Sequence, residues 1–301
     1  EQWYRRAIDA GENDAMSSLG VLLREAGQVQ EAEQWFHRAL DADAGDTDAM
    51  YNLGWLLADT DPREAEQWYR RAIDAGENDA MYNLGVLLHT SGQVQEAEQW
   101  FHRAIDADAG DTDAMRNLGW LLREAGLVQE AEQWYRRIID ADAGDTDAMR
   151  NLGVLLHKSG QVQEAEQWYR RAIDAGDTDA MHNLGVLLAD TDPREAEQWY
   201  RRAADAGDNR AMYNLGVLLW ETGQVQEAEQ WYRRAADAGN NHAMRNLGWL
   251  LRKAGQVQEA EQWYRRAIDA GNTNAIYNLF WLPAHTDSRE AEERKGAGSA
   301  Q

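Results

Sequence analysis

Two short segments recur along the whole length of this chain and indicate how it folds. Residues 64–72 read EAEQWYRRA and residues 80–88 read AMYNLGVLL, and close variants of both return in alternation. The methionine of the second segment marks each copy, at intervals of 31 to 34 residues: Met16, Met50, Met81, Met115, Met149, Met181, Met212 and Met244, with Ile276 in the ninth place. A period of this length is typical of solenoids, in which each repeat buries its apolar face against its neighbours.

Each repeat is predicted to contain two helices. Apolar and small residues follow one another at steps of three or four positions, as on one face of a helix, and do not alternate as in a strand. The first helix of a repeat shows this spacing at Ala49, Met50, Leu53, Gly54, Leu56 and Leu57, and the second helix at Val94, Ala97, Trp100, Phe101, Ala104 and Ile105. Glycine and alanine recur where the two helices must approach, as at Gly54, Gly85, Ala65 and Ala97.

The turns between the two helices come in two kinds. One ends in a glycine suited to a helix C-cap, as at Gly92. The other reads Asp-Thr-Asp-Pro-Arg-Glu at residues 59–64 and again at 190–195. Here we expect Asp61 to cap the next helix, the proline to take the first helical position, and Glu64 to close a capping box.

Composition excludes several classes of partner and of chemistry. The chain has 53 Asp and Glu against 30 Lys and Arg, a formal net charge of −23, which disfavours nucleic acid and anionic lipid as partners. It has no cysteine, no phosphate-binding glycine loop and no nucleophile elbow, and its histidines lack metal-ligand spacing. We therefore predict a protein that is not an enzyme and that needs no cofactor or metal.

Acidic loops at 41–48, 106–113 and 140–147 are similar to calcium loops in composition only. Their glycine comes one position early and the closing glutamate is missing, so the EF-hand pattern fails. We interpret these loops as helix caps with a solvated acidic edge.

The repeats resemble the tetratricopeptide repeat and the related Sel1-like repeat. The order of small and large residues in residues 112–145 matches the tetratricopeptide pattern, at Ala114, Leu118, Gly119, Leu122, Gly126, Ala131 and Tyr135. The ending Trp-Tyr-Arg-Arg-Ala-Ala-Asp-Ala-Gly at 199–207 is closer to Sel1-like units. The resemblance implies an all-α, right-handed superhelical solenoid of antiparallel helix pairs. It also implies that the first helices line a concave groove that binds peptides or proteins.

The predicted organisation follows from counting the copies. Residues 1–12 are the second helix of a truncated repeat, residues 13–273 are eight helix-pair repeats, residues 274–294 are a degenerate capping repeat, and residues 295–301 are a disordered tail. The chain begins within a repeat and lacks an initiator Met, so we interpret it as a fragment, with a cytoplasmic location expected and an upstream signal left open.

A few sites vary sharply between otherwise similar repeats. In the second copy they are Asp48, Tyr51, Trp55, Ala58 and Asp59, which form one side of the first helix, away from its core face. We call these sites the variable stripe. They collect Tyr, Trp, Arg and His, which are enriched at binding hot spots. Two basic clusters stand out: Arg116, Arg123 and Arg150 beside Trp120, and Arg245, Arg252 and Lys253 beside Trp249.

An asparagine follows the Tyr51 site in every copy from the second onward. Two roles stay open for it: a hydrogen bond to the backbone of a bound peptide, or a tie to a neighbouring loop. With these asparagines, the predicted peptide-binding residues are Tyr51, Trp55, Tyr82, Asn83, Arg116, Asn117, Trp120, Arg123, Arg150, Asn151, His157, His182, Tyr213, Trp220, Arg245, Trp249 and Arg252.

The predicted function is a scaffold that captures an extended acidic protein or peptide segment in the concave groove. Positive patches within an acidic body favour a partner that carries carboxylates. The alternative is a structural or self-assembly module of a larger regulatory protein, with end-to-end self-association of similar repeats.

Overall fold

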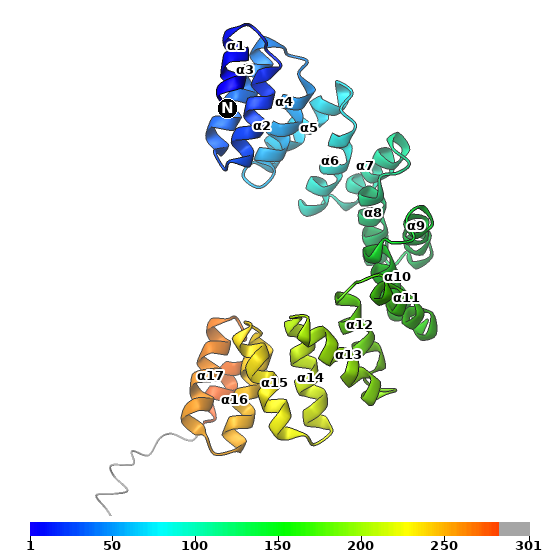
Figure 1. Ribbon diagram of the computed structural model, residues 1–301, viewed down its shortest axis with the longest axis vertical. Coiled ribbons are helices and arrows are strands. Elements are labelled where there is room, and N and C mark those ends of the chain that lie inside the picture. Colours follow the sequence, from blue (N-terminus) through cyan, green and yellow to red (C-terminus); the bar gives the residue numbers. More distant parts are fainter. Residues whose placement is uncertain (283–301) are drawn as a thin grey trace, which may run out of the picture. The chain divides into compact units, whose positions relative to one another are not determined.

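The computed structural model describes residues 1–282, and within them the secondary structure is helical throughout, with short turns (Figure 1). The chain divides into two compact units, which we call the N-terminal unit (Glu1–Leu155) and the C-terminal unit (Leu156–Gln301). Helices that begin in the N-terminal unit are α1 (Gln2–Asp9), α2 (Ala15–Glu25), α3 (Val29–Ala42), α4 (Thr47–Leu57), α5 (Pro62–Asp74), α6 (Asp79–Thr90), α7 (Val94–Ala107), α8 (Thr112–Glu124), α9 (Val128–Ala141) and α10 (Thr146–Lys158).

The C-terminal unit continues the same alternation of first and second helices. Its helices are α11 (Val162–Asp174), α12 (Asp179–Leu188), α13 (Pro193–Asp205), α14 (Asn209–Glu221), α15 (Val225–Asp237), α16 (Asn241–Lys253), α17 (Val257–Asp269) and α18 (Asn274–Phe280). The predicted capping repeat lies partly, and the predicted tail wholly, outside the described residues.

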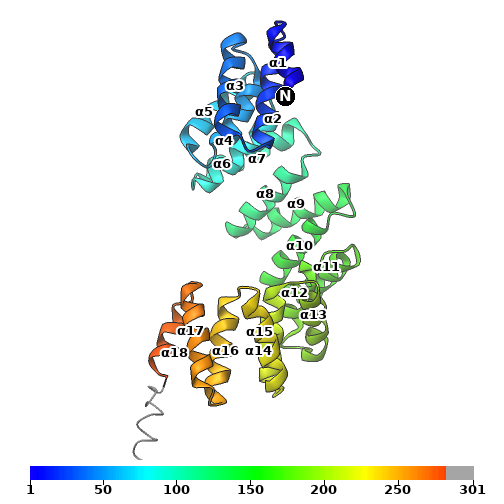
Figure 2. The ribbon, with the colours of Figure 1, turned by 60° about the vertical axis from the view of Figure 1, so that its left-hand side comes forward.

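Within each unit a first helix packs on the second helix of its own repeat and on the second helix of the repeat before it. Thus α16 contacts both α17 and α15, and the first helices α16 and α18 also touch each other. Two views show α14, α15, α16 and α17 side by side in this order (Figures 1 and 2). The prediction of an all-α solenoid of helix pairs is confirmed, because contacts join elements that are close in sequence.

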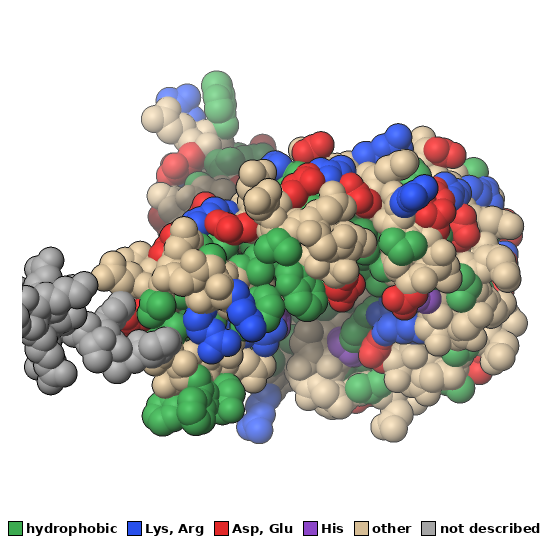
Figure 3. Space-filling model, turned by 90° about the horizontal axis from the view of Figure 1, so that it is seen from below, with side chains coloured by type: hydrophobic (Ala, Val, Ile, Leu, Met, Phe, Trp, Pro, Cys, Tyr) green, Lys and Arg blue, Asp and Glu red, His purple; other side chains and the backbone are tan. Residues whose placement is uncertain are grey.

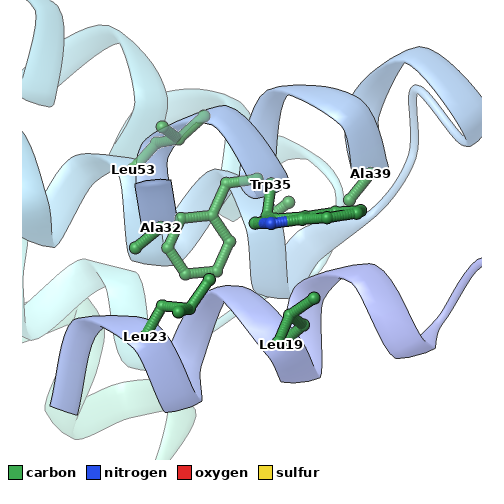
Figure 4. Close-up of a cluster of buried hydrophobic side chains, with 8 residues drawn as sticks. Leu19, Leu23, Ala32, Trp35, Ala39 and Leu53 are labelled. Atoms are coloured by element: carbon green, nitrogen blue, oxygen red, sulfur yellow. The ribbon is translucent and has the colours of Figure 1, made fainter. Parts of the chain in front are cut away.

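The core of each repeat forms where the two apolar helix faces meet. In the first complete repeat, Leu19 and Leu23 of α2 point toward Ala32 and Trp35 of α3, and Leu53 of α4 closes the cluster from the next repeat (Figure 4). All of these side chains are buried. One repeat therefore completes its core only with the help of the following one.

Glycine is required where the two helices cross. A Cβ atom built on Gly85 of α6 would lie 2.7 Å from the ring of Phe101 on α7, and one on Gly54 would lie 2.7 Å from the ring of Tyr69. These distances are shorter than real Cβ atoms tolerate, so the aromatic ring of the second helix occupies the space that a side chain would need.

The turns follow the predicted chemistry with one difference. Gly92 has a positive φ of 80°, and the Asp61 carboxylate accepts a hydrogen bond from the Glu64 backbone N–H at 3.1 Å, with Pro62 in the first turn of α5. The expected capping box does not form. The Asp61 N–H donates to the Leu57 carbonyl instead, and the Glu64 carboxylate accepts from the Trp68 indole N–H at 3.2 Å.

The acidic loops act as caps, as predicted. Asp46, Asp111 and Asp145 each accept a hydrogen bond from the backbone N–H three residues later, at the start of the next first helix. No group of three or more potential metal-binding side chains occurs within residues 1–282.

Ion pairs on the second helices join neighbouring repeats. Arg70 Nη2 lies 2.8 Å from Glu66 on the same helix and also pairs with Glu96 on the second helix of the next repeat. Arg201 pairs in the same way with Glu197 and Glu227. Figure 3 shows acidic and basic side chains interspersed on the face that it views.

No helix in the described part of the chain is long and apolar enough to cross a membrane.

Candidate functional site

The predicted site residues all lie on first helices, from α4 to α16, and each is half-buried or exposed. They differ in what they contact within the protein. These contacts decide which of them are available to a partner.

The recurring asparagines tie neighbouring first helices together. Asn83 Nδ2 donates to Tyr51 Oη at 3.0 Å and to the Asp79 carbonyl at 3.2 Å, and Asn117 Nδ2 donates to Tyr82 Oη at 3.3 Å. Both N–H groups of the Asn83 amide are therefore used. The expected tie to a loop is not what these asparagines make: Asn83 contacts Tyr51 on the first helix of the preceding repeat, and only its amide oxygen is left for a ligand.

The predicted basic cluster of the N-terminal unit is neutralised by the protein itself. The Arg116 guanidinium pairs with Asp113 on its own helix and, at 2.8 Å, with Asp145 at the start of α10. Arg123 pairs with Glu124 at 3.1 Å. Arg150 pairs with Asp147 on α10.

A pocket of about 430 Å³ opens beside the aromatic residues of the same unit, and it is acidic. Tyr51, Tyr82 and Asn83 share its wall with aspartates of α6, of the α7–α8 loop and of α8: Asp79, Asp108, Asp111 and Asp113. Burial, reinforced by the neighbouring Asp113 and Asp108 carboxylates, raises the pKa of Asp111. Further negative charge is therefore unfavourable in this pocket.

The C-terminal unit contains a pocket of about 310 Å³ with a different character. Its lining comes from the first helices α14, α16 and α18 and from one residue of α15: Trp220, Tyr232, Arg245, Asn246, Trp249, Leu250 and Asn278. The rings of Trp220 and Trp249 meet edge to face with centroids 5.6 Å apart. The predicted residues Trp220, Arg245 and Trp249 are thus brought together in one concave site.

This pocket is positively charged because Arg245 is the one charged residue among the described residues that line it, and α16 itself carries no acidic residue. Arg245 Nη2 donates to the Asn246 amide oxygen at 3.1 Å, and within residues 1–282 Arg245 has no carboxylate partner. The Lys253 ammonium lies 5.4 Å from the centre of the Trp249 ring. Arg252, near the end of the same helix, likewise has no ion pair among the described residues.

Sequence reasoning missed Tyr232 and Leu250 as lining residues. Tyr232 falls at the place of Phe101 on the predicted apolar face of the second helix, and its ring does pack against Gly216. Tyr232 nevertheless lines the pocket, and burial raises its pKa, an effect that the Asn246 side chain partly offsets. The sequence signal for Tyr232 was its hydroxyl, since the equivalent site in two other repeats holds phenylalanine, Phe36 and Phe101.

Comparisons with known proteins agree with the repeat pattern. A family model described as tetratricopeptide repeat matches residues 11–78, 76–143 and 208–272, and a second model of the same description matches residues 122–184. These matches cover more than half of the chain. The chain belongs to the tetratricopeptide repeat family. The Sel1 repeat model matches residues 1–12 and 178–208, so tetratricopeptide and Sel1 units alternate in one array.

Solved structures place the tetratricopeptide chain among helical repeat proteins. It is similar to a Sel1 repeat protein from Oxalobacter formigenes, with 31% identity and a TM-score of 0.54 over 74% of this chain and 99% of that one. It is also similar to YrrB, a tetratricopeptide protein described as having an unusual peptide-binding site, with 25% identity and a TM-score of 0.50 over 60% of this chain and 96% of that one.

The yeast Tom70 structure shares the fold, with 14% identity and a TM-score of 0.66 over 94% of this chain and 60% of that one. No curated protein matches the sequence. The family-model matches make the chain a tetratricopeptide repeat scaffold. Repeats of this family generally mediate protein–protein interactions and are not catalytic.

Proposed function

We propose that this chain is a non-enzymatic scaffold that binds an extended acidic segment of a partner protein, and that the pocket of the C-terminal unit is the main contact. The observation that carries the proposal is the Arg245 guanidinium, which lines a concave aromatic site and has no carboxylate partner among the described residues. A bound carboxylate would supply the charge-assisted hydrogen bonds that this guanidinium lacks.

The aromatic part of the pocket explains why a segment, and not a free anion, is the expected ligand. Trp220 is 42% exposed and stands edge to face with Trp249, so a side chain of the partner can bury apolar area against both rings. Tryptophan, tyrosine and arginine together are the residues that dominate binding energies at protein interfaces. We expect the partner to place an apolar residue near its acidic one.

The proposal confines the acidic contact to the C-terminal unit. In the N-terminal unit, Arg116 and Arg150 already pair with aspartates, and the pocket beside Tyr82 is lined by four aspartates. A cytoplasmic location, the lack of nucleic-acid partners and the alternative of end-to-end self-association stay predictions of the sequence.

The test is selection from a random peptide library on the intact chain and on a variant with Arg245→Ala and Trp249→Ala. The matched control carries Arg116→Ala and Trp120→Ala at the equivalent positions of the N-terminal unit. Helicity and the midpoint of thermal unfolding are measured for all three proteins. We expect an acidic motif that the intact chain and the control select and that the C-terminal variant does not.

Two results would refute the proposed function. One is no enrichment on the intact chain together with a concentration-dependent mass in sedimentation, which would favour self-assembly. The other is equal enrichment on the intact chain and on the variant with Arg245→Ala and Trp249→Ala, which would place binding elsewhere.

A further inference from the structure

Two arginines in equivalent positions of two repeats have opposite surroundings. Arg116 on α8 and Arg245 on α16 each precede the recurring asparagine, in the segments AMRNLGWLLR at 114–123 and 243–252. The first is held by two aspartates and the second by none. Since the two ten-residue segments are identical, the difference must come from outside them.

The two carboxylates that hold Arg116 are absent around Arg245. One comes from the first turn of the same helix, and the other from the residue before the first helix of the next repeat. Asp113, three positions before Arg116, is replaced by His242 before Arg245. Asp145, which precedes α10 and pairs with Arg116, is replaced by Asn272, which precedes α18. Both replacements remove a carboxylate that would otherwise neutralise Arg245.

Resting on the proposed function, we propose that Asn272 and His242 determine the specificity of the pocket. Because neither residue carries a carboxylate, the Arg245 guanidinium has no internal ion pair and can bind a carboxylate of the bound segment. The Arg116–Asp145 pair shows the contact that the ligand makes, because the ligand carboxylate takes the place at Arg245 that Asp145 takes at Arg116.

The geometry at Asn272 supports this assignment. Its side-chain amide donates to the Asn241 carbonyl at 3.2 Å, at the start of α16, and the residue is 5% exposed. Asn272 is therefore held by the backbone of the neighbouring first helix and places no negative charge beside Arg245. His242 is exposed, its Nδ1 lies 3.5 Å from Asn272 Nδ2, and its ring lies 5.9 Å from that of Tyr213.

The Asp145 carboxylate shows why an internal aspartate closes such a site. It is only 12% exposed, it lies 2.8 Å from the Arg116 guanidinium, and its other oxygen caps α10 by accepting from the Ala148 N–H at 2.7 Å. An external carboxylate would have to displace this partner and leave a half-buried acid unpaired, which is unfavourable. At Arg245 the ligand meets no such competitor.

The experiment places the missing aspartates in the intact chain. A fluorescein-labelled oligoglutamate peptide is titrated against the protein at low salt, with an oligoglutamine peptide of the same length as reference. We expect the double variant His242→Asp, Asn272→Asp to bind oligoglutamate about tenfold or more weakly, the loss of one charge-assisted contact. The charge-matched control Gln226→Glu, Gln258→Glu, on exposed second-helix positions of the same unit, should bind as the original does.

The reverse variant tests the same idea by gain of binding. Asp113→His with Asp145→Asn should free Arg116 and raise the stoichiometry of oligoglutamate from one to two. Helix α10 should stay capped, because Asn240 caps α16 by accepting from the Ala243 N–H at 3.0 Å. Circular dichroism and the midpoint of thermal unfolding check that each variant folds.

Three outcomes would overturn the inference: equal binding of oligoglutamate and oligoglutamine, unchanged binding after His242→Asp and Asn272→Asp, or an equal loss in the charge-matched control. The proposed function has a separate test, since a library can select a motif without acidic residues that still depends on Trp249. In that case peptide binding at this pocket would stand, and the acidic character of the segment would fall together with this inference. An acidic motif that depends on Arg245, combined with unchanged binding after His242→Asp and Asn272→Asp, would leave the proposed function standing and overturn only the inference.

Discussion

The residue type at each site of the variable stripe determines which contacts a first helix makes. At the site of Tyr51, tyrosine accepts a hydrogen bond from the asparagine of the next repeat, as Tyr82 does from Asn117. His182 makes the equivalent contact, with Nε2 3.0 Å from Asn214 Nδ2. Arginine at this site turns instead to carboxylates where they exist. Tyrosine and histidine at this site thus link repeats through a neutral hydrogen bond, whereas arginine brings a positive charge.

The contact of His182 predicts a pH dependence of stability. Burial lowers the pKa of His182 below its ordinary value, and the Asn214 amide donates to Nε2 only when the ring is neutral. Below the ordinary histidine pKa the unfolded chain takes up the proton more readily than the folded one, so the free energy of unfolding falls as pH decreases. We expect this loss to begin as pH falls through the ordinary histidine range and to end below the lowered pKa.

The matched variant is His182→Tyr, which copies Tyr82 and keeps an acceptor for Asn214. Urea unfolding of both proteins between pH 8 and 5 gives the difference in the free energy of unfolding. The original should lose more stability than the variant over this range. Parallel pH profiles would contradict the assigned role of His182.

Among the elements, two kinds of contact stabilise the array: close packing between the two helices of a repeat, and ion pairs between the second helices of neighbouring repeats. The glycine–aromatic contacts set how near the two helices of a repeat lie, as at Gly85 and Phe101. Arginines on the second helices pair with two glutamates, as Arg70 does with Glu66 and Glu96, and so join one repeat to the next. These ion pairs are partly exposed, so each contributes little to stability, whereas the contacts between helices are buried.

A substitution at the crossing separates packing from helix propensity. Alanine is the better helix former by about 0.5–1 kcal/mol, so propensity alone predicts that Gly85→Ala stabilises α6. Packing predicts the opposite, because the new Cβ would lie 2.7 Å from the Phe101 ring. We expect a net destabilisation of about 1–3 kcal/mol in urea unfolding.

The double variant Gly85→Ala, Phe101→Leu provides the control. Removing the ring should make the alanine less costly than it is in the single variant, so the two changes should be non-additive. A stabilising Gly85→Ala would show that α6 and α7 can separate freely.

At the scale of the whole molecule, stability is expected to be local because contacts join neighbouring elements. Leu118 of α8 is fully buried and α8 contacts α7 and α9, while Leu247 holds the equivalent place in α16. In such arrays the free energy is close to a sum over repeats and their interfaces. A defect in one repeat should therefore open its neighbours first.

Hydrogen exchange tests this locality. Leu118→Ala should cost about 2–5 kcal/mol and raise amide exchange in α7, α8 and α9, with α15–α17 unchanged. Leu247→Ala is the matched control and should give the opposite pattern. Uniform loss of protection along residues 1–282 in either variant would mean that the chain unfolds as one cooperative body.

Much of the architecture was predictable from the sequence because repetition multiplies a weak signal. Helix periodicity at Leu53 and Leu56, the glycine at 92 and the cap at Asp61 act locally, through backbone geometry and neighbouring side chains. The capping box failed because Trp68, one helical turn after Glu64, offered that carboxylate a competing donor. Periodicity predicts on which face of a helix a residue lies, but not which partner its polar atoms bind.

Residue spacing along the chain was enough to predict the helix pairs, the family resemblance and the variable stripe. The partners of the stripe residues depend instead on how neighbouring repeats pack. Arg116 and Arg245 stand in identical ten-residue segments, yet Asp145 from the next repeat neutralises the first, and Asn272 leaves the second without a charge partner. Charge pairing acts through space over a few ångströms, so a distance of 29 residues along the chain hides it from the sequence.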